Sequence, residues 1–564
     1  MDKKLNIGIL GCGASGLVTL KEILDEGHDG TVFEKSNVIG GLFTDVYQQG
    51  FMVSSNVVTM FSDFVGGNSE EGDEELLRKP RCWSFLEYSK YLNDYADHFK
   101  LRSHIHFRTN IQTVWKDVTT GKWKVRVMEG VGEGNEKEKV YQFDRIVVCT
   151  GTHHKRAVPY FAGQEKFQGK IKHLRDVKTF EEFTGHRVCI VGSGEGASDM
   201  TLAAAKHGKT SFISIRADHG WIVPRYTNGP HGPSDLNTTR VRTSIPYEWG
   251  VSFNFLVIMI NLFKAYILGL LTGQDFSLRK ATLKMNLKQI KTSNSKNTYG
   301  TKNNGLVEAL IRYKCERKPD IRELTEKTVI FDDGSEEEID EIVCCTGFQN
   351  EFPYLDTPDK EADPVHSKLV SKVAHEARIS HDLYKHCVHP DTGDELFFIG
   401  FARPCFGAIP PLSEMQARWY ALLCSKKVSL PDKQTLIRKS KEYVKYLEVR
   451  YTTYRTNRIV SLTDHAVYLD ELAREIGCRP PLVKMFFTEP YIWLKCMCAP
   501  LINAQYRLYG PNRQPEKARK IIRQVKWIRH MSIVFLFMLH TYGLFWFCGF
   551  KSCKPDTWYP ISDD

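Results

Sequence analysis

The sequence lacks several patterns that mark common classes of enzyme. No two of its 15 cysteines have Cys-x-x-Cys spacing, and the closest pairs, Cys344–Cys345 and Cys496-x-Cys498, have no histidines at zinc-ligand spacing. This argues against a metal site and against a thioredoxin-like redox motif. The sequence also contains no Gly-x-Ser-x-Gly motif, which would indicate a serine nucleophile.

An export signal and nucleic-acid-binding motifs are missing as well. The chain enters an apolar, strand-like run at Leu5, which leaves no room for a signal peptide and favours a body facing the cytosol. The formal net charge of +10 lies largely near the C-terminus, and no basic stretch carries a nucleic-acid-binding motif. This charge suits an anionic membrane surface better than nucleic acid. Several cysteines lie within apolar runs, so we expect buried free thiols in a reducing compartment.

The first 34 residues follow the order strand, glycine turn, helix and strand. Apolar residues fill the run from Leu5 to Leu10 and recur at helical spacing from Leu17 to Leu24. Between them, glycines at Gly-x-Gly-x-x-Gly spacing allow a tight turn and the approach of a pyrophosphate to the helix N-terminus. The next strand ends in an acid that is placed to accept a ribose hydroxyl. We therefore predict a dinucleotide site formed by Gly11, Gly13, Ala14, Ser15, Gly16 and Glu34.

A second glycine-rich segment follows this unit. It comprises Gly40, Gly41, Leu42 and Phe43. Adjacent glycines permit another close approach of the backbone to a ligand, and a plain turn is the alternative.

A second phosphate-binding unit begins at Arg187, about 180 residues after the first. An apolar strand is followed by a Gly-x-Gly-x-x-Ala turn and a helix; the turn consists of Gly192, Ser193, Gly194, Glu195, Gly196 and Ala197. Two such units indicate two nucleotides. The next strand ends in Arg216, where a cation favours a 2′-phosphate and hence NADPH over NADH. Glu195 in this turn could be read as a catalytic acid, but we expect its side chain to be that of a solvated loop residue. A strand-end arginine in solvent remains the alternative for Arg216.

Two nearly identical segments link the units. FDRIVVCTG (143–151) and IDEIVCCTG (339–347) each follow a hydrophilic, hairpin-like stretch and end in Cys-Thr-Gly, with Thr150 and Gly151 in one and Thr346 and Gly347 in the other. We interpret them as two crossings between domains, which places the second nucleotide unit inside the first. The predicted fold class is therefore α/β, with two Rossmann-like dinucleotide-binding domains, the second inserted in the first.

The chain resembles the flavin-containing monooxygenases of the microsomal, dimethylaniline type over residues 5–530. The resemblance rests on FQGKIKHLRDV (167–177), CCTGF (344–348), FIGFARPCFGAIPPLSEMQARW (398–419), YLDELAREIG (468–477) and YRLYGP (506–511). It implies FAD in the first unit and NADPH in the second. It also implies that Asn56 lies close to the flavin and that His173 is a linker residue governing movement of the NADPH domain. A satisfied structural histidine is the alternative for His173, and Val177 stands where the family has an aromatic residue.

The implied reaction is oxygenation of a soft nitrogen or sulfur nucleophile on a small lipophilic amine or sulfide. In the family, NADPH reduces FAD, and the reduced flavin reacts with O2 to form a C4a-hydroperoxyflavin. The protein orients the reactants and excludes water. Baeyer–Villiger oxygenation of a ketone and release of hydrogen peroxide as an NADPH oxidase are the near alternatives. A flavin-dependent reductase is the more distant one. A homo-oligomer is compatible with the sequence.

At 564 residues the chain is long enough for about three to four domains. We expect an FAD domain from 1–154 and 336–480, an NADPH domain from 155–335, and an apolar and basic membrane-proximal segment from 481–530. Residues 531–550 form an uncharged apolar stretch long enough to span a bilayer, followed by a short tail at 551–564. Basic residues precede this stretch, which predicts a C-terminal anchor in the endoplasmic reticulum membrane with the catalytic body in the cytosol. The apolar insertion near 248–272 contains polar residues, so we expect it to lie on the membrane, with a packed core helix as the alternative.

Overall fold

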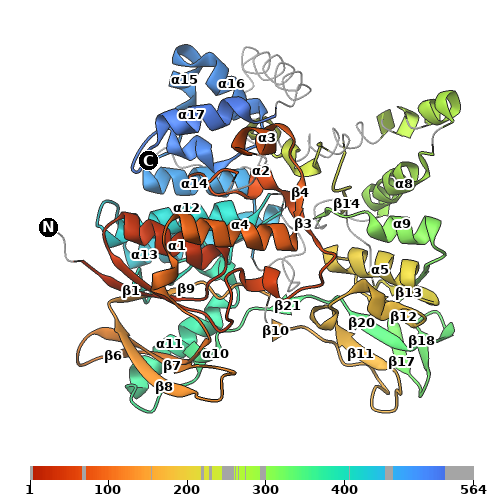
Figure 1. Cartoon of the computed structure of the whole chain (residues 1–564), viewed down its shortest axis with the longest axis horizontal. Coiled ribbons are helices and arrows are strands. Elements are labelled where there is room, and N and C mark those ends of the chain that lie inside the picture. The colour runs from red at the N-terminus through yellow and green to blue at the C-terminus, as the bar shows by residue number, and fades with distance from the viewer. Residues whose placement is uncertain are drawn as a thin grey trace.

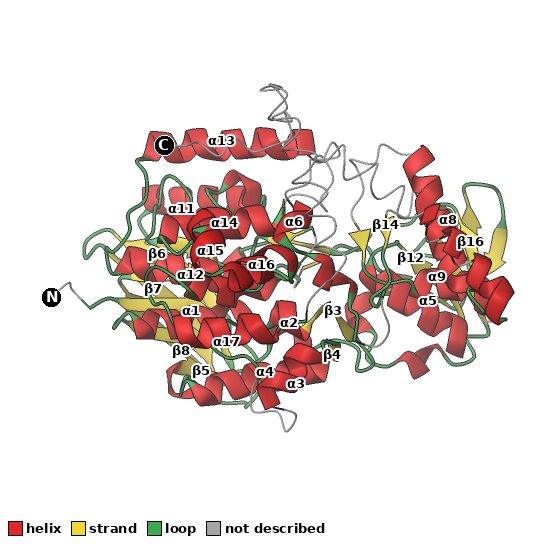
Figure 2. Cartoon of the chain, turned by 90° about the horizontal axis from the view of Figure 1, so that it is seen from above, coloured by secondary structure: helices red, strands yellow, loops and turns green. Residues whose placement is uncertain are grey.

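The computed structural model of the chain describes residues 4–66, 72–153, 155–216, 221–227, 231–243, 259–260, 262–264, 266–273, 275–292, 300–405, 407–450 and 461–526. Within them, two nucleotide-binding units lie side by side (Figures 1 and 2). The α/β class predicted from the sequence is confirmed.

Five parallel strands form the sheet of the first unit. Their order is β22 (Leu396–Phe398), β9 (Arg145–Val148), β1 (Asn6–Leu10), β2 (Asp29–Phe33) and β5 (Ile105–His106). The central strands are almost wholly apolar because helices cover both faces of the sheet. Helix α1 (Ala14–Asp25) packs closely against α12 (Ile409–Cys424), a buried helix from much later in the chain.

The second unit repeats this plan. Its parallel sheet has the order β11 (Lys170–His173), β20 (Glu341–Cys344), β12 (Arg187–Val191), β13 (Thr210–Ser214) and β16 (Glu316–Lys318). Helix α5 (Glu195–His207) follows β12 as α1 follows β1, and it packs against α9 (Gly305–Arg312).

Each unit also carries a three-stranded antiparallel meander directly before its Cys-Thr-Gly strand. These are β6 (Thr109–Asp117), β7 (Lys122–Glu129) and β8 (Lys137–Phe143) in the first unit, and β17 (Ile321–Leu324), β18 (Thr328–Phe331) and β19 (Glu336–Glu338) in the second. The internal similarity seen in the sequence therefore extends to whole supersecondary units.

The two chain crossings between the units are hydrogen-bonded to each other. Strand β10 (Lys155–Arg156) leaves the first unit and pairs antiparallel with β21 (Phe348–Gln349), which returns to it. This agrees with the interpretation of the repeated segments as crossings. Because β19 and β20 belong to the second unit, the expected domain boundary at residue 336 falls inside that unit.

The remaining elements connect the units and form a helical layer. In the N-terminal part they are β3 (Phe51–Ser55), α2 (Asn56–Thr59), α3 (Gly72–Arg78), β4 (Cys82–Ser84) and α4 (Phe85–His98). In the middle they are β14 (Trp221–Ile222), α6 (Arg240–Thr243), α8 (Ser277–Thr292), β15 (Gly300–Thr301), α10 (Pro353–Asp356), α11 (Pro364–Ala377) and β23 (Arg403–Pro404). The C-terminal ones are α13 (Lys433–Arg450), β24 (Leu462–Thr463), α14 (His465–Ile476), α15 (Leu482–Thr488), α16 (Pro490–Cys498) and α17 (Pro515–Gln524).

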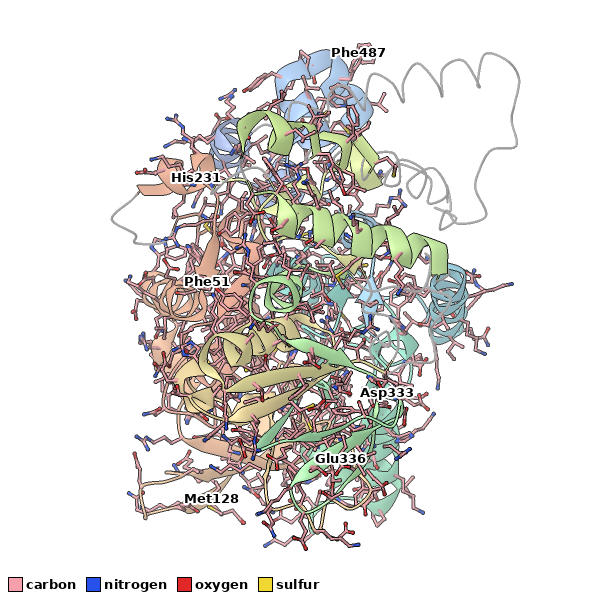
Figure 3. All side chains as sticks on the ribbon, turned by 90° about the vertical axis from the view of Figure 1, so that its right-hand side faces the viewer. Phe51, Met128, His231, Asp333, Glu336 and Phe487 are labelled. Carbon is pink, nitrogen blue, oxygen red and sulfur yellow. The ribbon has the colours of Figure 1, made fainter. Side chains whose placement is uncertain are left out.

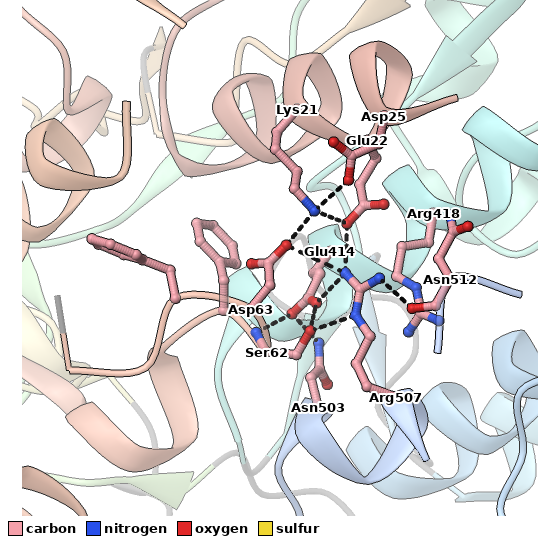
Figure 4. A network of polar contacts seen from close by, with 12 residues as sticks. Lys21, Glu22, Asp25, Ser62, Asp63, Glu414, Arg418, Asn503, Arg507 and Asn512 are labelled. Carbon is pink, nitrogen blue, oxygen red and sulfur yellow. Dashed lines mark hydrogen bonds and ion pairs between the residues drawn. The ribbon is translucent and has the colours of Figure 1, made fainter. Parts of the chain in front are cut away.

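A buried ionic cluster joins this C-terminal layer to the first unit (Figure 4). The Arg507 guanidinium lies 2.6 Å from a carboxylate oxygen of Glu22 in α1 and 3.2 Å from one of Glu414 in α12. Asp63 lies 3.5 Å from the same guanidinium and also pairs with Lys21, which is 3.3 Å from Glu22. All five side chains are buried.

The pKa of Glu22 shows how strongly the cluster is coupled. Burial alone would raise the pKa of this carboxyl group, but Arg507 and Lys21 lower it to about 2. The same carboxylates raise the pKa of Arg507 against the effect of burial. The oppositely charged partners of each buried ion therefore offset the cost of removing that ion from water.

The structure describes part of the predicted membrane-associated insertion but not the predicted membrane anchor. No helix among the described residues is long and apolar enough to span a bilayer, and the predicted anchor at 531–550 lies outside them. In the insertion near 248–272, the described side chains of Phe263, Leu270 and Leu271 are 69%, 81% and 77% exposed. These residues do not pack in a core. The described cysteines are free thiols, and all of them except Cys405 are buried, as expected.

Replacing Arg507 by Met should lower the free energy of unfolding by about 3–5 kcal/mol, because three buried carboxylates lose their shared cation. The loss should be larger at pH 8 than at pH 5. Without Arg507, the Glu22 carboxyl group loses the cation that contributes most to lowering its pKa, while burial still raises this pKa, so ionisation of Glu22 at higher pH destabilises the fold. Chemical denaturation of the purified protein measures both effects. Arg513→Met is the control, because Arg513 is exposed; equal losses in the two variants would contradict the prediction.

Candidate active site between the two nucleotide-binding units

The first glycine turn forms a tight cradle at the carboxyl end of β1. Gly11 has a φ of +100°, and a Cβ atom on Gly16 would lie 2.0 Å from the Gly11 carbonyl oxygen. Only glycine allows this approach of turn and helix. Gly13 caps the N-terminus of α1, with Ala14 and Ser15 in its first turn, so that free N–H groups face outward.

Glu34 and the Gly40–Gly41 turn complete this cradle. The Glu34 carboxylate accepts hydrogen bonds from the backbone N–H of Cys12 (2.9 Å) and of Ser36 (2.8 Å), which place it beside the glycine turn. A Cβ atom on Gly41 would lie 3.1 Å from the Gly13 Cα atom. The Gly40–Gly41 segment is thus packed against the first cradle rather than forming an independent turn.

Leu42 and Phe43 continue from this segment in a short 3-10 helix, Gly41–Thr44. The Phe43 ring stands edge-on to Tyr88 with 4.8 Å between ring centroids. This contact anchors the loop to α4.

The two Cys-Thr-Gly segments occupy equivalent places beneath the two cradles. A Cβ atom on Gly11 would lie 3.2 Å from the Thr150 Cα atom, and one on Gly192 would lie 2.7 Å from the Cys345 carbonyl oxygen. The Thr150 hydroxyl bonds to Tyr354 at 2.9 Å, and the Thr346 hydroxyl donates to the Ala157 carbonyl. Gly151 and Gly347 follow these threonines.

The second cradle follows β12. Gly192 has a φ of +121°. Gly194 caps α5, and a Cβ atom on it would meet no protein atom within 4 Å, so the inner surface of the turn is open. Ser193 is buried, and its carbonyl accepts a hydrogen bond from the Thr301 hydroxyl at 3.3 Å. Gly196 leads into the buried Ala197, so the alanine at the third turn position is accommodated.

Glu195 is not the solvated loop residue that the sequence led us to expect. Its carboxylate accepts a hydrogen bond of 2.5 Å from the Lys302 backbone N–H. Burial raises its pKa to about 7, although Lys302 and Arg225 oppose this shift. The side chain therefore titrates near neutral pH at the N-terminus of α5.

Arg216 lies two residues after β13 and is exposed. The strand registers align Ser214 with Phe33, so Ile215 takes the place of Glu34 and Arg216 lies one residue further along the chain. The residues of the two cradles fit an FAD and an NADPH, since close-packed glycines, free helix N-termini, and a strand-end acid or cation are all in place.

Asn56 and His173 are both held by the backbone. The buried Asn56 amide donates to the Leu76 carbonyl (3.2 Å) and accepts from the Arg81 N–H (3.0 Å). His173 donates from Nε2 to the Gly347 carbonyl (3.0 Å) and accepts at Nδ1 from the Arg175 N–H (3.2 Å). Burial lowers the His173 pKa, so the neutral ring connects β11 to the returning crossing. Their roles near the flavin and in domain movement stay predictions.

A polar network between the units was missed by the sequence reasoning. The Asp199 carboxylate on α5 accepts hydrogen bonds from Tyr47 of the first unit at 2.8 Å and from Arg225 at 3.0 Å. The Asn303 amide donates to the same carboxylate at 2.7 Å. Arg225 is therefore a partner of Asp199 rather than a surface cation. Asp199 lies just past the glycine turn and has no local pattern that distinguishes it from an exposed helix acid.

One substitution, made in each cradle, separates packing from ligand contact. Gly16→Ala should lower thermal stability and abolish flavin retention, because the new methyl group meets the Gly11 carbonyl. Gly194→Ala meets no protein atom, so it should leave stability unchanged and weaken NADP⁺ binding about tenfold by occupying space near the phosphates. Thermal unfolding, flavin content and equilibrium titration with NADP⁺ measure these effects. Unchanged NADP⁺ affinity in Gly194→Ala would contradict the assignment of the second cradle.

The pKa of Glu195 predicts a pH dependence of NADP⁺ affinity. Above about pH 7 the carboxylate is ionised and repels the nucleotide phosphates, so the affinity should fall as pH rises from 6 to 8. In Glu195→Gln this fall should flatten, which separates it from titration of the nucleotide itself. Fluorescence titration at several pH values measures the effect; parallel pH profiles for the two proteins would contradict it.

Comparison with known proteins agrees with this geometry. Residues 3–534 match the family described as flavin-binding monooxygenase-like. The chain is 30% identical to a 4-hydroxybenzoate brominase (decarboxylating) of Pseudoalteromonas luteoviolacea, over 92% of each protein, and 30% identical to flavin-containing monooxygenase 2 of Homo sapiens, over 93% of this chain and 91% of that protein. The structure of S-allyl-L-cysteine S-oxygenase from Allium sativum superposes with a TM-score of 0.57 at 20% identity, covering 96% of this chain and 99% of that one. The chain belongs to the flavin-binding monooxygenase-like family and is an oxidoreductase of the monooxygenase type.

Proposed function

We propose that the protein is an NADPH- and O2-dependent monooxygenase that transfers one oxygen atom to a soft nitrogen or sulfur of a small lipophilic substrate. The observation that carries the proposal is a contact between the two nucleotide-binding units. Lys302, whose backbone binds Glu195 at the second glycine turn, donates from Nζ to the Gly407 carbonyl of the first unit at 3.2 Å. Gly407 lies two residues before α12. This contact joins the second glycine turn to the segment before α12, which supports a shared site between the two units.

The residues of the chain would hold and orient the cofactors. In the first unit, the N–H groups at the start of α1 would bind the pyrophosphate and Glu34 the ribose; in the second, the start of α5 and Arg216 would take the corresponding roles. When bound, FAD and NADPH supply the redox chemistry, with NADPH as electron donor and the flavin as the group that reacts with O2. The apolar cores around both cradles limit the access of water.

A reaction of this kind needs no acid–base pair from the protein. Both ring nitrogens of His173 are engaged by backbone groups, which suits a joint between units better than proton transfer.

Val177 is fully buried in the core of the second unit. A Baeyer–Villiger reaction is disfavoured, since Val177 stands where such enzymes have a tryptophan.

We also propose that the protein lies on the endoplasmic reticulum membrane with its catalytic body in the cytosol. The exposed apolar side chains of the insertion are joined by Val483 and Phe487 of α15, which are 80% and 77% exposed. Both segments lie along the upper edge of the molecule in Figure 1, and Figure 3 places Phe487 at the end opposite the acidic Asp333 and Glu336. Such a surface can enter the lipid headgroup region.

Product analysis with two sulfides tests the oxygenation. The purified, detergent-solubilised protein is given NADPH and either thioanisole or (phenylthio)acetate, and O2 uptake, sulfoxide and hydrogen peroxide are quantified. Most of the NADPH oxidised with at least one sulfide should appear as sulfoxide, with hydrogen peroxide falling below its substrate-free level. Hydrogen peroxide equal to NADPH with both sulfides would identify an oxidase instead. NADPH oxidation without O2 uptake would identify a reductase.

A further inference from the structure

Several buried polar atoms at the interface between the units have no hydrogen-bond partner among the described residues. They are Glu195 Oε2, Arg225 Nε, Asp235 Oδ1, and both ring nitrogens of His465. Buried polar atoms are partnered in the great majority of cases, and exceptions that gather in one place call for a polar ligand. The mechanism proposed above uses none of these atoms.

Lys302 lies at the centre of this group. Its backbone donates to Glu195 in the second cradle, while its buried side chain reaches the Gly407 carbonyl of the first unit. A Cβ atom on Gly407 would lie 2.5 Å from the His465 ring, so this ring packs directly against Gly407. Lys302 and His465 therefore flank the same residue, just before the N-terminus of α12.

The charges around Lys302 leave room for an anion. No carboxylate of the described residues forms an ion pair with Lys302, and its ammonium group has three donors, of which one reaches Gly407. Burial raises the pKa of Asp235. It raises that of Glu195 to about 7, which weakens the negative charge that Glu195 offers near neutral pH. Burial and the nearby Lys302 lower the His465 pKa to about 3, so His465 is neutral and presents one donor and one acceptor.

We propose that Lys302 and His465 bind a carboxylate of the substrate, so that the favoured substrate is a soft nitrogen or sulfur nucleophile carrying a carboxylic acid. This proposal rests on the proposed function. One carboxylate oxygen pairs with the Lys302 ammonium group, and the other accepts from the His465 N–H. A cationic amine without an acid would meet like charge from Lys302.

Binding measured without turnover tests the proposal independently of oxygenation. The full-length, flavin-loaded protein is titrated with (phenylthio)acetate and with thioanisole, and the change in the flavin absorbance spectrum gives each Kd. The wild type should bind the acid at least tenfold more tightly than thioanisole. Lys302→Met should weaken binding of the acid at least tenfold and leave thioanisole within twofold, while Lys302→Arg, which retains the cation, should restore most of the affinity for the acid.

Two controls separate this effect from loss of folding and from general charge. Lys209→Met removes an exposed lysine of the same unit and should leave both Kd values unchanged. His465→Phe should weaken binding of the acid alone. Equal affinity of the wild type for both ligands, or equal weakening of both ligands in Lys302→Met, would overturn the proposal. Sulfoxide formation would still decide the proposed function separately, because binding of the acid does not depend on oxygen transfer.

Discussion

The buried cation Arg507 is the contact on which the first unit and the C-terminal layer jointly depend. It comes from a segment nearly 500 residues along the chain from Glu22, yet it binds α1, α12 and the Ser62–Asp63 turn together. Helix α1 begins at the first glycine turn, and α12 begins two residues after Gly407, which contacts Lys302. The orientation of these helix starts is therefore maintained by charges at Glu22, about two turns into α1, and at Glu414, about one and a half turns into α12. Such a cluster adds little net stability compared with apolar packing, but it allows few alternative arrangements.

The two units share the same set of structural elements in addition to their similar sequence segments. Each has a parallel sheet, a glycine turn, a meander and a Cys-Thr-Gly segment that supports the first glycine of its cradle. The contacts between them include polar ones, such as those of Asp199 with Tyr47 and of Lys302 with Gly407, and an apolar one, in which the Tyr47 ring stacks on Phe180 with 5.6 Å between ring centroids. The neutral His173 holds the returning crossing at the edge of this interface.

Local patterns in the sequence were sufficient for much of this architecture. Glycine spacing, apolar runs and strand-end charges predicted both cradles, and the repeated segments at 143–151 and 339–347 predicted the insertion of one unit in the other. The same approach failed for Glu195, whose partner lies 107 residues later in the chain, because nothing in a glycine turn reveals a distant backbone donor. It also missed the pairing of Asp199 and the Arg507 cluster. Contacts between remote positions leave no period or spacing that one sequence can display, and burial then changes the pKa of such groups in ways that composition cannot anticipate.

The insertion has a consequence for how the chain reaches its native state. The first sheet needs β22, which is synthesised about 250 residues after its neighbour β9, whereas the strands of the second sheet all lie between residues 170 and 344. Closing such a long loop delays pairing, while contiguous segments can fold as units during synthesis. The second unit can therefore be complete on the ribosome while the first still exposes an edge of its sheet along β9. The paired strands β10 and β21 then bring the two halves of the first unit close together, so that a folded insert shortens the search for the last strand.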